Sequence, residues 1–234
     1  MTLRSSPPLA ALISSLALGA CEPGGASPIP QPTVLEVDDL TVNVDIPDAG
    51  HAFPTIDGRP GSAPAGATIQ ITALDGAAAP STGSAASDGS FEVEFAANIG
   101  DELRIEWLRD GDRSPPLDVI LSQSGADVVL VASPRFECLT LSPGFVLSFA
   151  TVQTRTLSFA SSCTEPATLD NTRTRLGSTH FRVASAPPIE VPPAGSNGLD
   201  VTFTPLAGDE AEDVLFVDVT TSGETIRYPI TLIP

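Results

Sequence analysis

Alternation of apolar and polar residues with a period of two is the sequence feature that most limits what this chain can fold into. Leu40, Val42 and Val44 share one face of an extended segment, with polar residues between them. This period matches a β-strand that buries one face, and we expect charged residues on the other face to lie in solvent, as in antiparallel sheets. The alternation covers residues 40–46, 67–73, 91–95 and 103–107.

Glycine-containing turn signals separate these segments. The chain has 23 Pro and 19 Gly, which favours many turns and short strands over long helices. No amphipathic helix is expected after residue 21. The fold class predicted is all-β, with two Ig-like β-sandwich domains. The predicted turns lie at Asp57-Gly58, Asp75-Gly76, Asp88-Gly89 and Asp110-Gly111.

The first 20 residues have the pattern of an export signal. Arg4 precedes a 12-residue apolar run from Leu9 to Ala20, which is too short to span a bilayer. The run ends in Leu18-Gly-Ala-Cys21, which resembles a bacterial lipobox. That resemblance implies cleavage between Ala20 and Cys21 and lipid attachment to the Cys21 thiol. The alternatives are an ordinary secretory signal or an apolar N-terminus of a cytosolic protein.

Two or three acyl chains on Cys21 would hold the protein at a membrane essentially permanently, at about 0.8 kcal/mol per buried CH₂. In the lipoproteins it resembles, Asp after the cysteine often signals inner-membrane retention. Glu22 stands here, so we expect the outer membrane. Residues 22–33 hold four prolines and two glycines, which predicts an extended tether of roughly 35 to 40 Å. The expected layout is signal peptide 1–20, lipidated Cys21 and tether 21–33, and sandwiches 34–133 and 134–234.

The first module carries Pro64-Ala-Gly-Ala67-Thr-Ile, Ser87-Asp-Gly-Ser-Phe91, Gly100-Asp-Glu-Leu103 and Asp110-Gly-Asp-Arg-Ser114. This order of motifs resembles bacterial Ig-like repeats. Such turns also occur in carboxypeptidase regulatory-like domains, so the family of this module stays open.

The second module carries Leu139-Thr-Leu-Ser-Pro143, Leu147-Ser-Phe149-Ala-Thr-Val152, Leu199-Asp-Val-Thr-Phe-Thr-Pro205 and Ile226-Arg-Tyr-Pro-Ile-Thr-Leu232. This order resembles an ASPM-SPD-2-Hydin (ASH) domain. Ala150 and Thr154 depart from it, since glycine is usual there. The resemblance implies an Ig-like sandwich that serves as an interaction module.

Cysteine usage agrees with export. With Cys21 lipidated, Cys138 and Cys163 remain as an even pair, which predicts a disulfide in the second module. A metal or redox pair is the alternative, but the spacing is not C-x-x-C and no histidine lies nearby in sequence.

The charge excludes whole classes of partner. The chain has 29 Asp+Glu against 11 basic residues, for a net charge of −18, and every basic residue is arginine. Nucleic acids and anionic headgroups would be repelled. Without lysine there is no P-loop. Cleavage before Cys21 leaves 10 Arg against 29 Asp+Glu, so electrostatics cannot hold the mature chain to a membrane.

Residues that could carry chemistry are few. His51 and His180 are expected at the surface without metal-ligand spacing, and no nucleophile motif occurs. Calcium could use Asp38-Asp39, Asp110-Gly-Asp112 or residues 208–213, although solvated turns are the commoner explanation. Trp107 and Tyr228 could form a carbohydrate platform, but core packing is expected.

We therefore expect a non-catalytic interaction or scaffold protein, anchored to the membrane by lipid, with an envelope protein as partner. It would have no cofactor, no metal and no nucleic-acid partner. The alternatives are an adhesin-like module for glycan or peptidoglycan, and an enzyme of unknown type.

Overall fold

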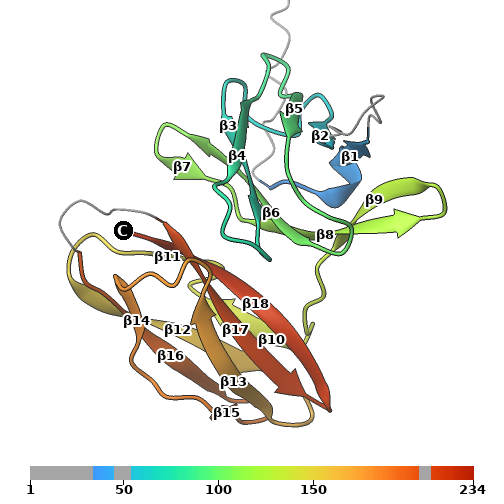
Figure 1. The fold of residues 1–234 in the computed structure, drawn as a ribbon. Coiled ribbons are helices and arrows are strands. Elements are labelled where there is room, and N and C mark those ends of the chain that lie inside the picture. The colour runs from blue at the N-terminus through green and yellow to red at the C-terminus, as the bar shows by residue number, and fades with distance from the viewer. Residues whose placement is uncertain (1–33, 45–53, 206–211) are drawn as a thin grey trace, which may run out of the picture. The chain divides into compact units, whose positions relative to one another are not determined.

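The computed structural model describes residues 34–44, 54–205 and 212–234, and these form an all-β protein (Figure 1). The only helical element among them is a 3₁₀ turn, η1 (Val37–Asp39), and none of their helices is long and apolar enough to cross a membrane. Within these described ranges, eighteen strands make up four sheets, and all pairings but one are antiparallel. The predicted fold class is confirmed.

The first sandwich, residues 40–132, packs a three-stranded sheet (order β1-β2-β5) on a larger one (order β4-β3-β6-β8-β9, with β7 on β6). Buried side chains from both sheets share one core, for example Ile56 and Val93 from one and Ile69 and Ile105 from the other. Its strands are β1 (Leu40–Asn43), β2 (Thr55–Gly58), β3 (Thr68–Ala73), β4 (Ser81–Ser84), β5 (Phe91–Glu94), β6 (Glu102–Arg109), β7 (Asp112–Arg113), β8 (Leu117–Ser124) and β9 (Asp127–Ala132).

The second sandwich, residues 139–233, packs a four-stranded sheet (order β10-β12-β16-β14) on a five-stranded one (order β11-β18-β17-β13-β15). Phe149, Phe159, Phe181, Phe203 and Tyr228 give its core an aromatic centre. Its strands are β10 (Leu139–Ser142), β11 (Val146–Ser148), β12 (Gln153–Ser161), β13 (Ala167–Thr174), β14 (Phe181–Val183), β15 (Ile189–Val191), β16 (Ser196–Phe203), β17 (Asp213–Thr221) and β18 (Glu224–Ile233).

Three of the four Asp-Gly pairs lie in turns, but Asp57-Gly58 does not. Gly58 ends β2 and pairs with Leu40 on one side and Phe91 on the other. A Cβ on Gly58 would lie 2.3 Å from the Phe91 ring, so the glycine is there to let the ring pack against the backbone. At Asp110-Gly111 both residues have positive φ, 52° and 89°, as a tight β6–β7 hairpin requires.

The two cores are separate clusters, yet residues 31–234 form one compact unit by their contacts. The segment between β9 and β10 joins the two sandwiches, and Arg135 on that segment contacts both. The boundary at residues 133 and 134 stays a prediction.

Candidate functional site

The charged face of β6 is buried, contrary to the prediction that it lies in solvent. Glu102, Arg104 and Glu106 alternate with the core residues Leu103 and Ile105, as expected, but Arg104 is only 1% exposed and Glu106 only 2%. Residues of β18 contact this face, so the polar side of one sandwich packs on the polar side of the other. We call this contact the junction. Alternation predicted the two faces correctly but not what covers the second one.

Arg104 is the centre of the junction. Its Nε and Nη2 donate to the two carboxylate oxygens of Asp118 on β8, at 2.7 and 2.9 Å. Its Nη1 donates to the Thr231 hydroxyl at 2.6 Å, and Nη2 also donates to the Pro229 carbonyl at 2.5 Å. A bidentate pair with both partners buried is a strong, directional contact. The guanidinium therefore links two strands of the first sandwich to β18 of the second.

Two further arginines extend this network. Arg135 donates from Nη2 to Asp118 at 2.5 Å, and its guanidinium lies 5.2 Å from the Tyr228 ring centre. Arg227 donates to Glu102 from Nε and Nη2, and its Nη1 lies 2.8 Å from Asp75. Burial acts to raise the pKa of Asp75, but hydrogen bonds from Arg227 and the Glu102 amide outweigh it and lower that pKa. Asp75 is therefore held as a carboxylate.

Glu106 is the junction residue whose burial is only partly offset by its contacts. Its Oε2 accepts from Arg113 at 3.0 Å, while its Oε1 is buried without a hydrogen bond to any described residue. Burial raises the pKa of Glu106, and attraction to Arg113 and Arg104 offsets only part of that rise. Arg113 also donates to Glu212 of the second sandwich. The ionised form of Glu106 is thus held at a free-energy cost.

A small apolar cluster completes the junction. Leu74 of the first sandwich packs with Val214 and Phe216 of the second, and all three are at most 6% exposed. Val214 and Phe216 alternate with the core residues of β17, so they point away from the core of their own sandwich. They are buried only because Leu74 and the charged groups cover them.

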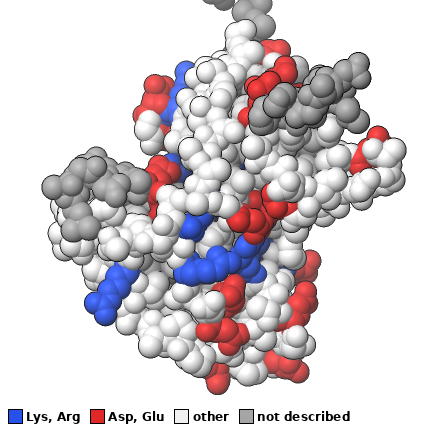
Figure 2. All heavy atoms as spheres, viewed as in Figure 1, with Lys and Arg blue, Asp and Glu red and all other residues white. Residues whose placement is uncertain are grey.

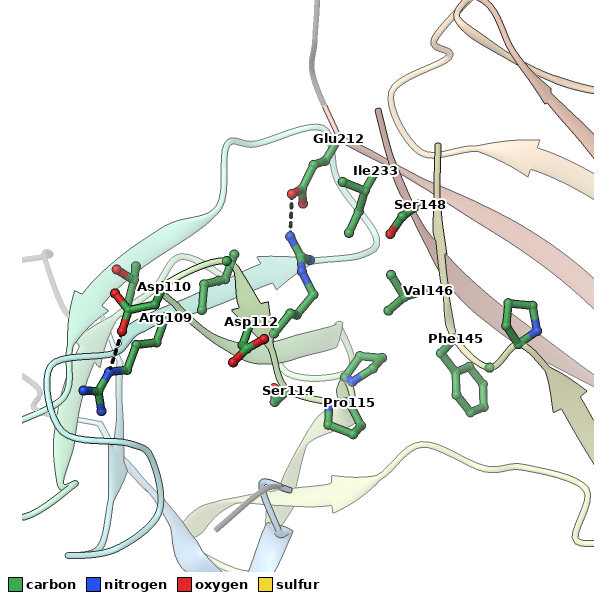
Figure 3. A pocket seen from close by; sticks show the side chains of 17 residues that line it. Arg109, Asp110, Asp112, Ser114, Pro115, Phe145, Val146, Ser148, Glu212 and Ile233 are labelled. Carbon is green, nitrogen blue, oxygen red and sulfur yellow. Dashed lines mark hydrogen bonds and ion pairs between the residues drawn. The ribbon is translucent and has the colours of Figure 1, made fainter. Parts of the chain in front are cut away.

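An open pocket of about 830 Å³ lies where hairpin and loop residues of both sandwiches meet (Figure 3). The β6–β7 hairpin and the following Pro115 form one wall, and Phe145, Val146 and Ser148 form the other. The salt bridge between Arg113 and Glu212 spans the two walls. The pocket combines apolar walls with charged groups at the hairpin.

Strand β11 borders this pocket and has one free edge. It pairs with β18 in parallel, through the Phe145 carbonyl to Thr231 and the Phe149 amide to Ile233. Because hydrogen bonds alternate along a strand, the amides of Val146 and Ser148 face the opposite edge. In the described part of the chain, no strand pairs with that edge.

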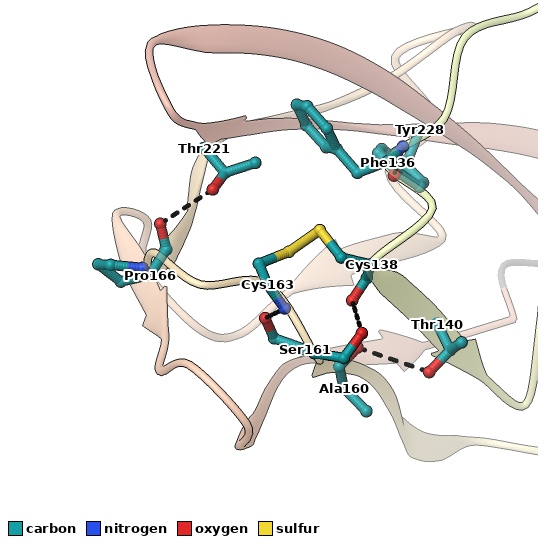
Figure 4. Close-up of a disulfide and its surroundings, with 10 residues drawn as sticks. Phe136, Cys138, Thr140, Ala160, Ser161, Cys163, Pro166, Thr221 and Tyr228 are labelled. Carbon is teal, nitrogen blue, oxygen red and sulfur yellow. Dashed lines mark hydrogen bonds between the residues drawn. A yellow bond between two sulfur atoms is a disulfide. The ribbon is translucent and has the colours of Figure 1, made fainter.

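The predicted disulfide between Cys138 and Cys163 is present (Figure 4). Ser162 donates from its amide and its hydroxyl to the Cys138 carbonyl, which holds the two cysteine-bearing segments side by side. The bridge joins the start of β10 to the segment just after β12, at the edge of the second core. Its role is to staple this sandwich. Ala20 and Cys21 lie outside the described residues.

The remaining candidates for chemistry are not brought together. His180 is buried, 4% exposed, so the expectation of a surface histidine is wrong, and His51 lies outside the described residues. Tyr228 is buried in the second core, and Trp107 packs against the first, so they form no carbohydrate platform. Tyr228 accepts the Phe136 amide through its hydroxyl.

The acidic clusters considered for calcium have other roles. Asp39 pairs with Arg59, and Asp110 lies in the β6–β7 hairpin turn. Asp213 is 3% exposed and accepts the amides of Leu176, Ser178 and Val214, while residues 208–211 lie outside the described part. No group of three or more His, Cys, Asp or Glu side chains among the described residues could hold a metal ion.

Several solved structures are distantly similar to this chain. No family model matches the sequence, and no curated protein matches it. A C. elegans MSP family member is 18% identical at a TM-score of 0.34, over 42% of this chain and 98% of that one. The VesB protease of Vibrio cholerae is 11% identical at 0.36, over 75% of this chain and 64% of that one. A Porphyromonas gingivalis protein of unknown function is 10% identical at 0.31, over 77% and 89%. These distant likenesses assign no family and carry no activity to this chain.

Proposed function

We propose that this protein is a lipid-anchored envelope protein of a bacterium, held at the outer membrane by Cys21, and that its two sandwiches form a non-catalytic interaction or scaffold module. The lipobox-like Leu18–Cys21 and the short apolar run before it support the anchor. At the finer level, the motif order in each module supports a bacterial Ig-like first sandwich and an ASH-like second one.

The free edge of β11 beside the pocket is the observation that carries the interaction role. An extended segment of a partner could hydrogen-bond to the amides and carbonyls of Val146 and Ser148, and so add a strand to the five-stranded sheet. Its side chains would meet Phe145 and Pro115 in the pocket walls. The partner class proposed is therefore a protein with an extended, partly apolar segment.

The junction explains why two sandwiches are needed. One pocket wall belongs to the first sandwich and the other to the second, so the pocket exists only while the Arg104 network holds them together. A scaffold with a fixed binding edge is consistent with directional, buried hydrogen bonds at this contact.

Site-specific photocrosslinking in intact cells tests the interaction. A photoreactive phenylalanine analogue at Ser148, which is exposed at the β11 edge, should give a discrete protein adduct. The same analogue at Arg155, which is exposed on β12 of the other sheet, is the matched control and should give none. Adducts of equal yield at both sites, or none at Ser148, would contradict the docking role.

Metabolic labelling with a fatty-acid analogue tests the anchor. The parent protein should be labelled and should fractionate with the outer membrane, whereas Cys21→Ser should be unlabelled and should leave the membrane fraction. Equal labelling of both proteins would exclude Cys21 as the lipid site.

A further inference from the structure

A second, smaller hollow of about 320 Å³ brings together three of the 11 arginines of this acidic chain. It lies beside the turn that follows β3, with Arg173 and Arg175 from the β13 segment, Arg227 from β18 and Phe216 from β17. Asp75 is the only carboxylate among its lining residues. Figure 2 shows basic side chains gathered near the middle of the face in view, with acidic side chains above and below them.

A β-bulge turns two of these arginines toward the hollow. Leu169 on β13 faces Val219 and points into the core, so strict alternation would send residues 171, 173 and 175 inward as well. The register shifts by one residue between Leu169 and Asn171, after which Arg173 faces Phe216 on the outer side of the sheet. Without the bulge, these arginines would point into an apolar core.

The Phe216 ring fixes the guanidinium groups in place. The guanidinium carbon of Arg173 lies 4.4 Å from the ring centre and that of Arg227 lies 4.8 Å from it. Both distances are within the range of attractive cation–π contacts. The ring therefore contacts two positively charged groups that line the same hollow.

The three arginines differ in how their donors are used. Arg227 is paired with the two carboxylates of Glu102 and Asp75. Arg175 donates from Nε to the Ala73 carbonyl at 3.0 Å and from Nη2 to the Ala78 carbonyl, which holds it without neutralising it. Its Nη1 has no hydrogen bond to the described residues, and Arg173 has neither a hydrogen bond nor an ion pair to any of them.

Asp75 attracts Arg173 and Asp213 attracts Arg175, but neither carboxylate forms a hydrogen bond or an ion pair with these two arginines. Asp213 is occupied by three backbone amides, and Asp218 accepts a hydrogen bond from Asn171 at 3.2 Å. Asp75 and Glu102 are bound to Arg227. The guanidinium N–H groups of Arg173 and the Nη1 of Arg175 therefore have no hydrogen-bond acceptor among the described residues, and both side chains line the hollow.

We propose that this hollow binds an oxyanion, a phosphate or carboxylate group, through a bidentate contact with Arg173 and a further hydrogen bond from Arg175. The planar arginine fork matches the oxygen spacing of both groups. The hollow is lined by different residues from the β11 pocket, so this proposal is independent of the docking role and can fail or succeed on its own.

Calorimetric titration of the full protein in detergent with inorganic phosphate, and separately with acetate, tests the site at constant ionic strength maintained with chloride. Saturable binding of one anion per chain is expected. Arg173→Gln should weaken it roughly tenfold or more, as expected for losing charge-assisted hydrogen bonds. Arg173→Lys keeps the charge but loses the fork, and should also bind more weakly than the parent.

Arg155→Gln removes the same charge from the other sheet and is the matched control, expected to leave the affinity unchanged. Preference for phosphate or for acetate identifies the oxyanion. Absence of saturation with both anions, or equal weakening by Arg173→Gln and Arg155→Gln, would overturn the proposal. Because Arg173 is exposed, its variants should keep the parent's far-ultraviolet circular dichroism.

Discussion

The two sheets of the second sandwich present polar outer faces that have opposite fates. On the four-stranded sheet, Thr154 and Thr202 share a hydrogen bond at 2.8 Å and Thr156 donates to Asp200, all in contact with solvent. On the five-stranded sheet, Thr231 is buried beneath Arg104 of the first sandwich. The same alternation gives a wet surface in one place and a buried charged contact in the other. The difference is that the first sandwich covers one face and not the other, and the sequence of a single strand does not encode this.

The largest expected contrast comes from removing one carboxylate at the junction, Asp118 of the first sandwich, and one on the solvent-exposed face of the four-stranded sheet, Asp200. Asp118→Ala leaves Arg104 buried without its bidentate partner and should lower the free energy of unfolding by about 3 to 5 kcal/mol. Asp200→Ala on the wet face should change it by about 0.5 kcal/mol or less. Chemical denaturation of both variants measures the difference, and similar losses would remove the distinction between the faces.

The apolar part of the junction gives the next effect. Leu74→Ala should cost about 2 to 3 kcal/mol, because it opens a cavity against Val214 and Phe216. Val152→Ala, at a residue that is 63% exposed, is the control and should be nearly neutral. A neutral Leu74→Ala would mean that this cluster does not contribute to holding the sandwiches together.

Acid should weaken the junction through Asp75. Its pKa is lowered in the folded state, so its contribution to stability is present above the unfolded pKa and is lost as the pH falls through the folded one. Asp75→Asn should therefore be less stable than the parent at pH 7, by under about 1 kcal/mol because the group is partly solvated. The two proteins should converge in strong acid. A difference that grows on acidification would contradict this assignment.

Glu106 should show the smallest effect, with the opposite sign. Its pKa is raised, so the folded state favours the protonated acid, and that contribution is lost as the pH rises through the folded pKa. Glu106→Gln should be neutral or more stable than the parent at pH 7, by a few tenths of a kcal/mol, and the gain should vanish in acid. Thermal unfolding at both pH values checks this. A destabilised variant at pH 7 would show that the Arg113 contact outweighs burial.

Local patterns in the sequence identified much of the fold. Period-two alternation located β1, β3, β5 and β6, and the even cysteine pair predicted the Cys138–Cys163 bridge. The β13 segment was not recognised as a strand, because the bulge after Leu169 breaks the alternation on which the prediction depends.

Much less of the candidate sites could be predicted from the sequence. The junction joins residues up to 127 positions apart, Arg104 and Thr231, and no spacing rule connects them. In sequence, Asp57-Gly58 has the pattern of a turn. The position of the Phe91 ring explains why a glycine stands there, and no local pattern in the sequence predicts that position. The one available hint of the junction was the set of three charged residues on β6, and solvent explained them equally well. Whether a polar face is buried depends on whether another sandwich packs on it, and the alternation within one strand carries no information about that.

Calorimetric unfolding of the intact chain tests most directly whether the junction joins the two sandwiches. The parent should unfold in a single transition whose calorimetric and van't Hoff enthalpies agree, because each sandwich stabilises the other. Asp118→Ala should split it into two transitions. Two independent transitions in the parent, with Asp118→Ala shifting only one of them, would contradict the junction as the element that makes the sandwiches one body.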